Sequence, residues 1–304
     1  MSELAANNPL DSLDVFWTEL SPNRAVVYAR LTGQEYRADW RLTGTIRGPH
    51  SARHETLPAT IAFQDLGPGP TQLARAVVPD PSDWSPQAPN VYQVTIELLR
   101  EGKEPLRTER RIGFKPIRAA ERYLLREGKT WVPRGVLVEW VSEADFLPVR
   151  EHQPVLVLPS LTEPTLGWAS QQGAYVAVRF SGTTDQIARD LRRFAAWPAA
   201  WLAIIDCAAG FDYREVAPNL VLAQVLQDEC RLQPWCQAIW AADSLGPAML
   251  RRCLGFGKPT LVYRNDPRQP SLLEVRASCD ALQRDLAPIG QFAGYFVESI
   301  DFRD

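Results

Sequence analysis

The fold of the second half is decided by three short apolar runs: Pro154-Val-Leu-Val-Leu-Pro159, Tyr175-Val-Ala-Val-Arg-Phe180 and Trp201-Leu-Ala-Ile-Ile-Asp206. Each run is followed by a polar or Pro/Gly-containing loop. Strands of a parallel sheet that is covered on both faces have this texture. Four similar runs bring the expected strands to seven, and they cover residues 135–140, 236–241, 259–264 and 294–298. The second half is therefore predicted to be α/β.

Amphipathic segments separate these runs, with apolar residues at spacings of three and four. They cover residues 184–196, 215–229, 248–254 and 272–286. Repeated βα units favour a (β/α) TIM-type barrel, but residues 135–304 are fewer than the ~200 that a complete barrel usually needs. We therefore expect a contracted barrel in which one unit, the sixth, is trimmed or lost. An open α/β sheet is the alternative.

The first part of the chain has a different texture, with short alternating strands punctuated by Pro and Gly. The clearest strands cover residues 26–31, 60–63, 73–78 and 92–98. Such spacing is typical of an antiparallel β-sandwich with one solvated face. Because 304 residues are long enough for two cores, we predict a β-sandwich over residues 1–120 and the barrel over residues 121–304.

Composition and charge restrict the classes of partner. Hydrophobic residues make up 45% of the chain, and the formal net charge is −3. This balance gives no electrostatic footprint for nucleic acid or an anionic membrane. Residues 1–9 have neither the basic nor the apolar part of a signal peptide, and no run approaches the ~18 apolar residues of a membrane span. We expect a soluble, cytoplasmic protein.

The few cysteines and histidines argue against metal or cofactor chemistry. The five cysteines are odd in number and form no C-x-x-C pair, which indicates reduced, mostly buried thiols; they are Cys207, Cys230, Cys236, Cys253 and Cys279. The chain has three histidines, His50, His54 and His152. We therefore expect no metal site, no cofactor and no Ser-His-Asp triad.

Three ordered motifs carry a resemblance to a known family. They are Asp-Trp-Ser-Pro-Gln-Ala-Pro-Asn-Val-Tyr over residues 83–92, Gly-Phe-Lys-Pro-Ile over 113–117, and Gly-Lys-Thr-Trp-Val-Pro-Arg-Gly-Val over 128–136. This series resembles glycoside hydrolase family 2, where the pattern runs W-S-P-x-x-P-x-L-Y, G-F-R-x-I and N-G-K-P-x-x-L-R-G-V. The resemblance implies that the first two motifs close an immunoglobulin-like domain and that the third leads into the first strand of a TIM barrel.

Weaker similarities extend over most of the chain. Residues 196–201 resemble the family's lead into strand four, residues 257–263 its lead into strand seven, and residues 291–297 its last strand. The resemblance does not include the family's N-terminal jelly-roll domain. It implies O-glycosyl hydrolysis, or a derived role in carbohydrate metabolism, with a carbohydrate as ligand; it names no protein partner.

The residues at the expected catalytic positions do not fit that activity. Retaining hydrolysis needs two carboxyl groups about 5 to 5.5 Å apart, which the family supplies as glutamates at the ends of strands four and seven. Counted along this sequence, the acid/base position falls at Cys207-Ala208 and the nucleophile position at Arg264. Neither can do this work. We therefore expect a pseudoenzyme that binds carbohydrate or acts as an interaction protein.

A slip of one or two residues in this alignment leaves an alternative. It would bring Asp206 or Asp212 to the first position and Asp266 to the second, with Glu298 on the last strand as a further carboxylate. The alternative is thus an active glycoside hydrolase that uses relocated carboxylates at the barrel mouth.

Several other side chains are expected at the carboxyl ends of the strands, where barrel enzymes place their sites. We expect the charges there to pair as salt bridges, with a glycan-binding remnant as the alternative; the charged residues are Glu139, Arg179, Asp206, Asp243, Arg264 and Glu298. Trp140 and Tyr263 are the preferred aromatic platforms for a sugar ring. Trp168, Trp201 and Trp240 are weaker candidates for stacking, and we assign Trp84, Trp131 and Tyr92 to packing.

Overall fold

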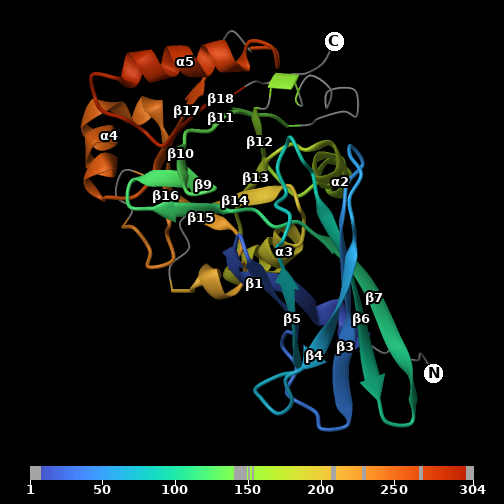
Figure 1. Cartoon of the computed structure of the whole chain (residues 1–304). Helices are drawn as coiled ribbons and strands as arrows, with labels where there is room; N and C mark the ends of the chain where they lie inside the picture. Colours follow the sequence, from blue (N-terminus) through green and yellow to red (C-terminus); the bar gives the residue numbers. More distant parts are fainter. Residues whose placement is uncertain are drawn as a thin grey trace, which may run out of the picture. The chain divides into compact units, whose positions relative to one another are not determined.

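The computed structural model describes residues 8–139, 149, 151–152, 154–206, 210–227, 231–266 and 270–298. The chain divides into two compact units (Figure 1). The first contains residues 1–84 and 90–114, and the second contains residues 85–89 and 115–304. Among the described residues, no helix is both long enough and apolar enough to cross a membrane.

The first unit is an antiparallel sheet preceded by a 3-10 turn, η1 (Pro9–Ser12). Its strands are β1 (Leu13–Ser21), β2 (Arg24–Leu31), β3 (Trp40–His50), β4 (Ala59–Asp65), β5 (Leu73–Pro79), β6 (Val91–Arg100) and β7 (Lys103–Ile112). The four strands predicted from alternation lie in β2, β4, β5 and β6, which confirms them. In β5 and β6, buried and solvent-facing residues alternate as a half-buried strand requires.

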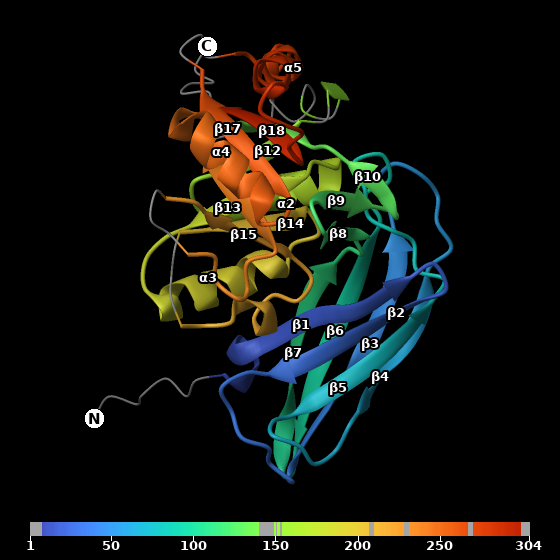
Figure 2. The same ribbon diagram turned by 90° about the vertical axis from the view of Figure 1, so that its left-hand side faces the viewer.

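The sheet is ordered β1-β2-β5-β4-β3-β6-β7, and β4 connects its two halves. Residues 59–63 of β4 pair with β3, whereas Gln64 and Asp65 pair with β5. Side chains from both halves pack into one hydrophobic core, so the sheet behaves as a sandwich (Figure 2). Gly44 allows the close approach of β3 to β6, because its φ is 147° and a Cβ there would lie 2.0 Å from the Thr95 carbonyl oxygen.

The second unit begins with a small sheet and continues as a closed barrel of eight parallel strands. The small sheet contains β8 (Ile117–Ala120), β9 (Tyr123–Arg126) and β10 (Lys129–Trp131). The barrel strands are β11 (Arg134–Leu137), β12 (Val155–Leu158), β13 (Val176–Phe180), β14 (Ala200–Ile205), β15 (Val221–Val225), β16 (Ala238–Ala242), β17 (Thr260–Asn265) and β18 (Gly294–Glu298). The open sheet is therefore wrong, and the barrel is confirmed.

The expected count of seven strands is also wrong. The strand that the sequence did not reveal is β15, the fifth, which lies inside the segment 215–229 that we predicted as a helix. All five of its residues are buried, and an apolar run buried on both faces cannot be told from a buried helix by periodicity alone. The run at 236–241 is consequently the sixth strand, not the fifth. The strands at 200–205, 260–265 and 294–298 are the fourth, seventh and eighth, as expected.

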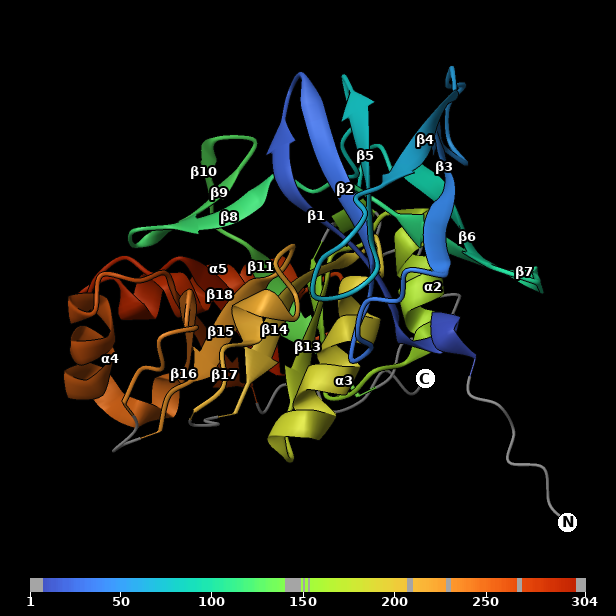
Figure 3. The ribbon, with the colours of Figure 1, turned by 90° about the horizontal axis from the view of Figure 1, so that it is seen from below.

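The barrel has all eight strands, and its small size comes from short or irregular connections between them. The helices are α2 (Glu163–Gln172), α3 (Thr184–Ala195), α4 (Gly246–Gly255) and α5 (Val275–Leu286), and two 3-10 turns are η2 (Tyr213–Glu215) and η3 (Asp243–Leu245). Helices α3, α4 and α5 confirm three predicted segments. Within the described residues that follow β14 and β15, no α-helix returns to the barrel. Helices α2 and α3 lie along one side of it and α4 and α5 along the other (Figure 3).

A five-residue segment belongs to the second unit although it interrupts the first in sequence. Residues 85–89 pack with the barrel unit, and Pro86 lies against the end of α2. Gly173 makes this approach possible, because its φ is 83° and a Cβ there would lie 2.4 Å from the Pro86 carbonyl oxygen.

Candidate functional site

The carboxyl ends of the barrel strands gather charged and aromatic side chains on one rim. Arg179 lies on β13, and Asp206 directly follows β14. Tyr263 and Arg264 lie near the end of β17, and Glu298 ends β18. Neighbouring strands are in register here, with Arg264 opposite Val297 and the next residue opposite Glu298. The rim predicted from the strand ends is therefore present.

Two arginines organise most of the charge on this rim. The Arg179 guanidinium pairs with Asp206 at 3.1 Å, which links β13 to β14. Arg264 makes two ion pairs, from Nε to Asp243 at 2.5 Å and from Nη1 to Asp285 at 2.7 Å. The salt bridges expected from the sequence are confirmed for these two arginines.

Arg264 is held firmly in its cationic form. Burial by itself would lower the pKa of Arg264, but the hydrogen bonds to Asp285 and Asp243 outweigh this effect and raise the pKa above its ordinary value. The end of the seventh strand therefore carries a fixed positive charge.

The pKa of the Tyr263 hydroxyl depends on burial and on the charges around it. Burial is the main reason why the pKa of its hydroxyl is raised; the charge of Arg179 lowers it, and the charges of Glu298, Asp206 and Asp243 raise it. The Tyr263 ring stacks on Trp240, with ring centroids 5.4 Å apart and planes inclined by 14°. Tyr263 is thus a protonated hydrogen-bonding group on a half-buried, supported ring.

The remaining expected carboxylates differ in their surroundings. Asp266, which directly follows β17, is 2% exposed, so its carboxyl group is buried. Asp212 is tied to Arg214 in η2, and hydrogen bonds from that arginine lower the pKa of the Asp212 carboxyl group. Glu139 is exposed after β11, and Glu298 is half-buried. Trp140, Cys207 and Ala208 lie outside the described residues.

The weaker aromatic candidates are corrected by their burial. Trp201 and Trp240 are each 1% exposed, so neither offers a face to a sugar. Trp240 instead supports Tyr263 from below and contacts Phe296, whereas Trp201 packs against Trp131 with centroids 4.9 Å apart. Trp168 is half-buried on α2.

The burial of two aromatic side chains and of three cysteines agrees with the predictions. Trp84 and Tyr92 are fully buried, as expected. Within the described part of the chain, the free and buried cysteines are Cys236, Cys253 and Cys279.

One site residue was missed by the sequence reasoning. Asp285 lies on α5, and its carboxylate is one of the two partners of Arg264. Asp285 is not at a strand end, where the barrel topology predicts functional side chains. The only signal was its position on the polar face of an amphipathic segment.

Comparison with known proteins finds a family model that matches the first part of the chain. Residues 14–115 match the model for glycosyl hydrolases family 2. The resemblance inferred from the sequence is thereby confirmed, and the chain is family 2-like with an immunoglobulin-like domain. No curated protein sequence matches it.

Solved structures match almost the whole chain. A β-glucuronidase of Bacteroides uniformis has a TM-score of 0.64 and 14% identity, over 94% of this chain and 45% of that one. A β-D-glucuronidase of Dictyoglomus thermophilum gives 0.61 and 14%, over 94% and 61%. A β-glucuronidase of Parabacteroides merdae gives 0.63 and 11%, over 95% and 47%. This chain thus spans about half the length of these proteins, and the likeness at such identities concerns the fold.

Proposed function

We propose that this family 2-like chain is a non-catalytic carbohydrate-binding protein whose ligand site is the carboxyl-terminal mouth of its barrel. The observation that carries the proposal is Arg264. It stands at the end of the seventh strand, where the family resemblance implies a nucleophilic glutamate, and it is fixed there by Asp243 and Asp285.

A cation at this position opposes glycosidic bond cleavage. The transition state has oxocarbenium character, and its positive anomeric centre needs a carboxylate beside it. A guanidinium remains protonated and has no lone pair with which to attack. Arg264 therefore cannot act as the nucleophile of a retaining hydrolase.

The relocated carboxylates are less well placed than an active pair requires. Asp206 follows the fourth strand but already accepts a hydrogen bond from Arg179. Asp266 follows the seventh strand but is buried. The alternative, an active hydrolase that uses these two groups with Glu298, requires both to be released toward the same substrate.

The same rim suits the binding of a hydroxyl-rich ligand. Ion-paired arginines and carboxylates present donors and acceptors side by side, and sugar hydroxyls can use both. The supported ring of Tyr263 offers an apolar platform for sugar C–H groups. The buried free thiols of the barrel support a cytoplasmic location, where thiols stay reduced.

The decisive experiment separates turnover from binding. The purified chain is assayed with aryl β-glycosides and α-arabinosides beside Asp206→Ala and Asp266→Ala variants. We expect no turnover above that of the variants. Turnover that either substitution abolishes would establish the active hydrolase instead.

Binding is then measured on a glycan array and by calorimetry. We expect Tyr263→Ala to weaken binding of the selected glycan about tenfold, the scale of one good aromatic contact. Tyr123→Ala is the matched control, because Tyr123 is 45% exposed on the small sheet of the same unit. An array without any bound glycan would refute carbohydrate binding and favour a protein-interaction role.

A further inference from the structure

A cavity lies at the amino-terminal end of the barrel strands, opposite the rim described above. Its volume is about 470 Å³, within the range of small-molecule sites. Its lining includes Arg134, the first residue of β11, and Tyr175, which directly precedes β13. The ends of β9 and β10 and the first turn of α5 complete the wall. The amino-terminal rim is far from the place where barrel enzymes carry out catalysis, so a ligand here would bind outside the site proposed above.

The lining of this amino-terminal cavity holds more arginines than carboxylates. The three arginines are Arg126, Arg134 and Arg276, and the one carboxylate among the lining residues is that of Glu151. In the described part of the chain, the only ion pair that these residues make joins Arg134 to Asp280. Beyond that pair, Arg126 and Arg276 stand against Glu151 alone, so positive charge is in excess by about one unit.

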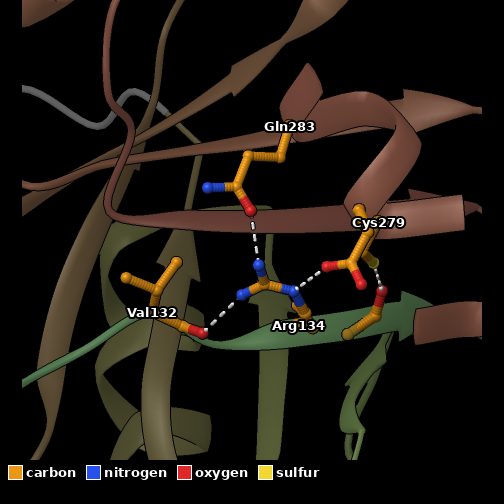
Figure 4. A network of polar contacts seen from close by, with 6 residues as sticks. Val132, Arg134, Cys279 and Gln283 are labelled. Carbon is orange, nitrogen blue, oxygen red and sulfur yellow. Dashed lines mark hydrogen bonds and ion pairs between the residues drawn. The ribbon is translucent and has the colours of Figure 1, made fainter. Parts of the chain in front are cut away.

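Arg134 is held in place with donor capacity to spare (Figure 4). Its Nε donates to Asp280 Oδ1 at 2.5 Å, its Nη1 to the Val132 carbonyl oxygen at 3.2 Å, and its Nη2 to Gln283 Oε1. A guanidinium has five N–H donors, so these three bonds leave two for another acceptor. The group is thus fixed before any ligand arrives, which reduces the entropy lost on binding.

An aromatic wall stands beside the charges. Trp131 is partly exposed at the end of β10, and the Arg126 guanidinium lies 5.5 Å from the centroid of its ring. The ring of Tyr175 is 5.2 Å from that of Trp131. A flat apolar surface next to guanidinium groups suits a molecule that has a ring and an anionic group.

We propose that the amino-terminal cavity binds a small organic anion, in which a carboxylate or phosphate contacts the arginines and a flat ring packs against Trp131. Arg134 supplies the fixed donors, the exposed Arg276 in the first turn of α5 supplies a further charge, and Arg126 orders the tryptophan ring. This site is independent of the carbohydrate site, because it uses none of the carboxyl-terminal rim residues.

The test uses two anions and a neutral analogue. Phenyl phosphate, benzoate and benzyl alcohol are titrated into the whole protein, with calorimetry and tryptophan fluorescence as readouts. We expect at least one anion to bind with a dissociation constant below about 10 mM and the alcohol not to bind. The two anions distinguish phosphate from carboxylate as the preferred group. If neither anion binds, or if the alcohol binds equally well, the proposal is wrong.

Variants locate the binding. Arg276→Gln should weaken binding of the preferred anion about tenfold, the lower end of the range for a charge-assisted hydrogen bond. Arg284→Gln is the matched control, since Arg284 is exposed in the last turn of the same helix and is not in the cavity wall. Tyr263→Ala, at the other rim, should also leave binding unchanged. Equal effects of Arg276→Gln and Arg284→Gln would refute the assignment.

Discussion

Lys115 gives the stability of the second unit a distinctive dependence on pH. The residue is 4% exposed, and burial lowers the pKa of its amine to about 7. In an unfolded chain the pKa of lysine is about 10.4. Between these values the unfolded chain holds a proton that the folded chain has released. Stability must therefore rise as the pH increases through this window.

The size of the effect follows from the two pKa values. Between pH 7 and about pH 8.5, the linkage relation gives a gain of about 1.5 kcal/mol in the free energy of unfolding. A Lys115→Met variant has no group to titrate, so its stability relative to the native protein should fall by that amount over the same interval. Urea denaturation at the two pH values measures this difference.

Lys129→Met is the control, because Lys129 is exposed on β10. Its stability relative to the native protein should be the same at both pH values. Other groups that titrate in this interval are shared by all three proteins, and their contributions cancel in the comparison. A Lys115→Met difference that stays constant with pH would show that the folded protein keeps Lys115 charged, and the reasoning from burial would fail.

Two further outcomes are expected. Gly135→Ala should lower the free energy of unfolding by about 1 to 3 kcal/mol, because a Cβ there would lie 2.5 Å from the Val155 carbonyl oxygen and 2.6 Å from the Phe296 ring. Gly255→Ala is the control and should be neutral or stabilising, because a Cβ there meets nothing within 4 Å. Equal effects of the two substitutions in urea denaturation would contradict the prediction. Burial raises the pKa of Cys253 to about 11 and that of Cys279 to about 12. Mass spectrometry after alkylation at pH 8 should therefore find both thiols unmodified in the folded protein and modified in urea. Rapid labelling of the folded protein would refute this prediction.

The runs of apolar residues predicted most of the barrel strands, because a strand that is buried on both faces must be apolar along its whole length. Runs such as 176–180 and 200–205 are apolar on both faces and could be placed in order as barrel strands. The fifth strand escaped because its neighbours Leu220 and Leu226 extend the apolar run, so that a helical spacing fitted as well as a strand. The contraction among the described residues that follow β14 and β15 could not be predicted from length alone, since length does not say which element is shortened.

The residues of the carboxyl-terminal rim could be predicted from the sequence, whereas those of the amino-terminal cavity could not. Arg179, Asp206 and Arg264 were found because parallel strands bring their carboxyl ends together whatever the loops do. The amino-terminal cavity draws single residues from several elements, and no local pattern marks such a set. Trp131 was assigned to packing, which its contacts with Tyr175 and Trp201 confirm, but its partial exposure depends on tertiary structure.

The segment 85–89 has a consequence for biosynthesis. The first unit is complete once Phe114 has left the ribosome, whereas Pro86 must wait for α2 and Gly173 to be translated. Domains generally fold as units in the order of synthesis, so a nascent chain would carry a finished sheet with this short loop still unprotected. Pro86 would then be a point at which the barrel unit, as it emerges, packs against a segment that was made before it.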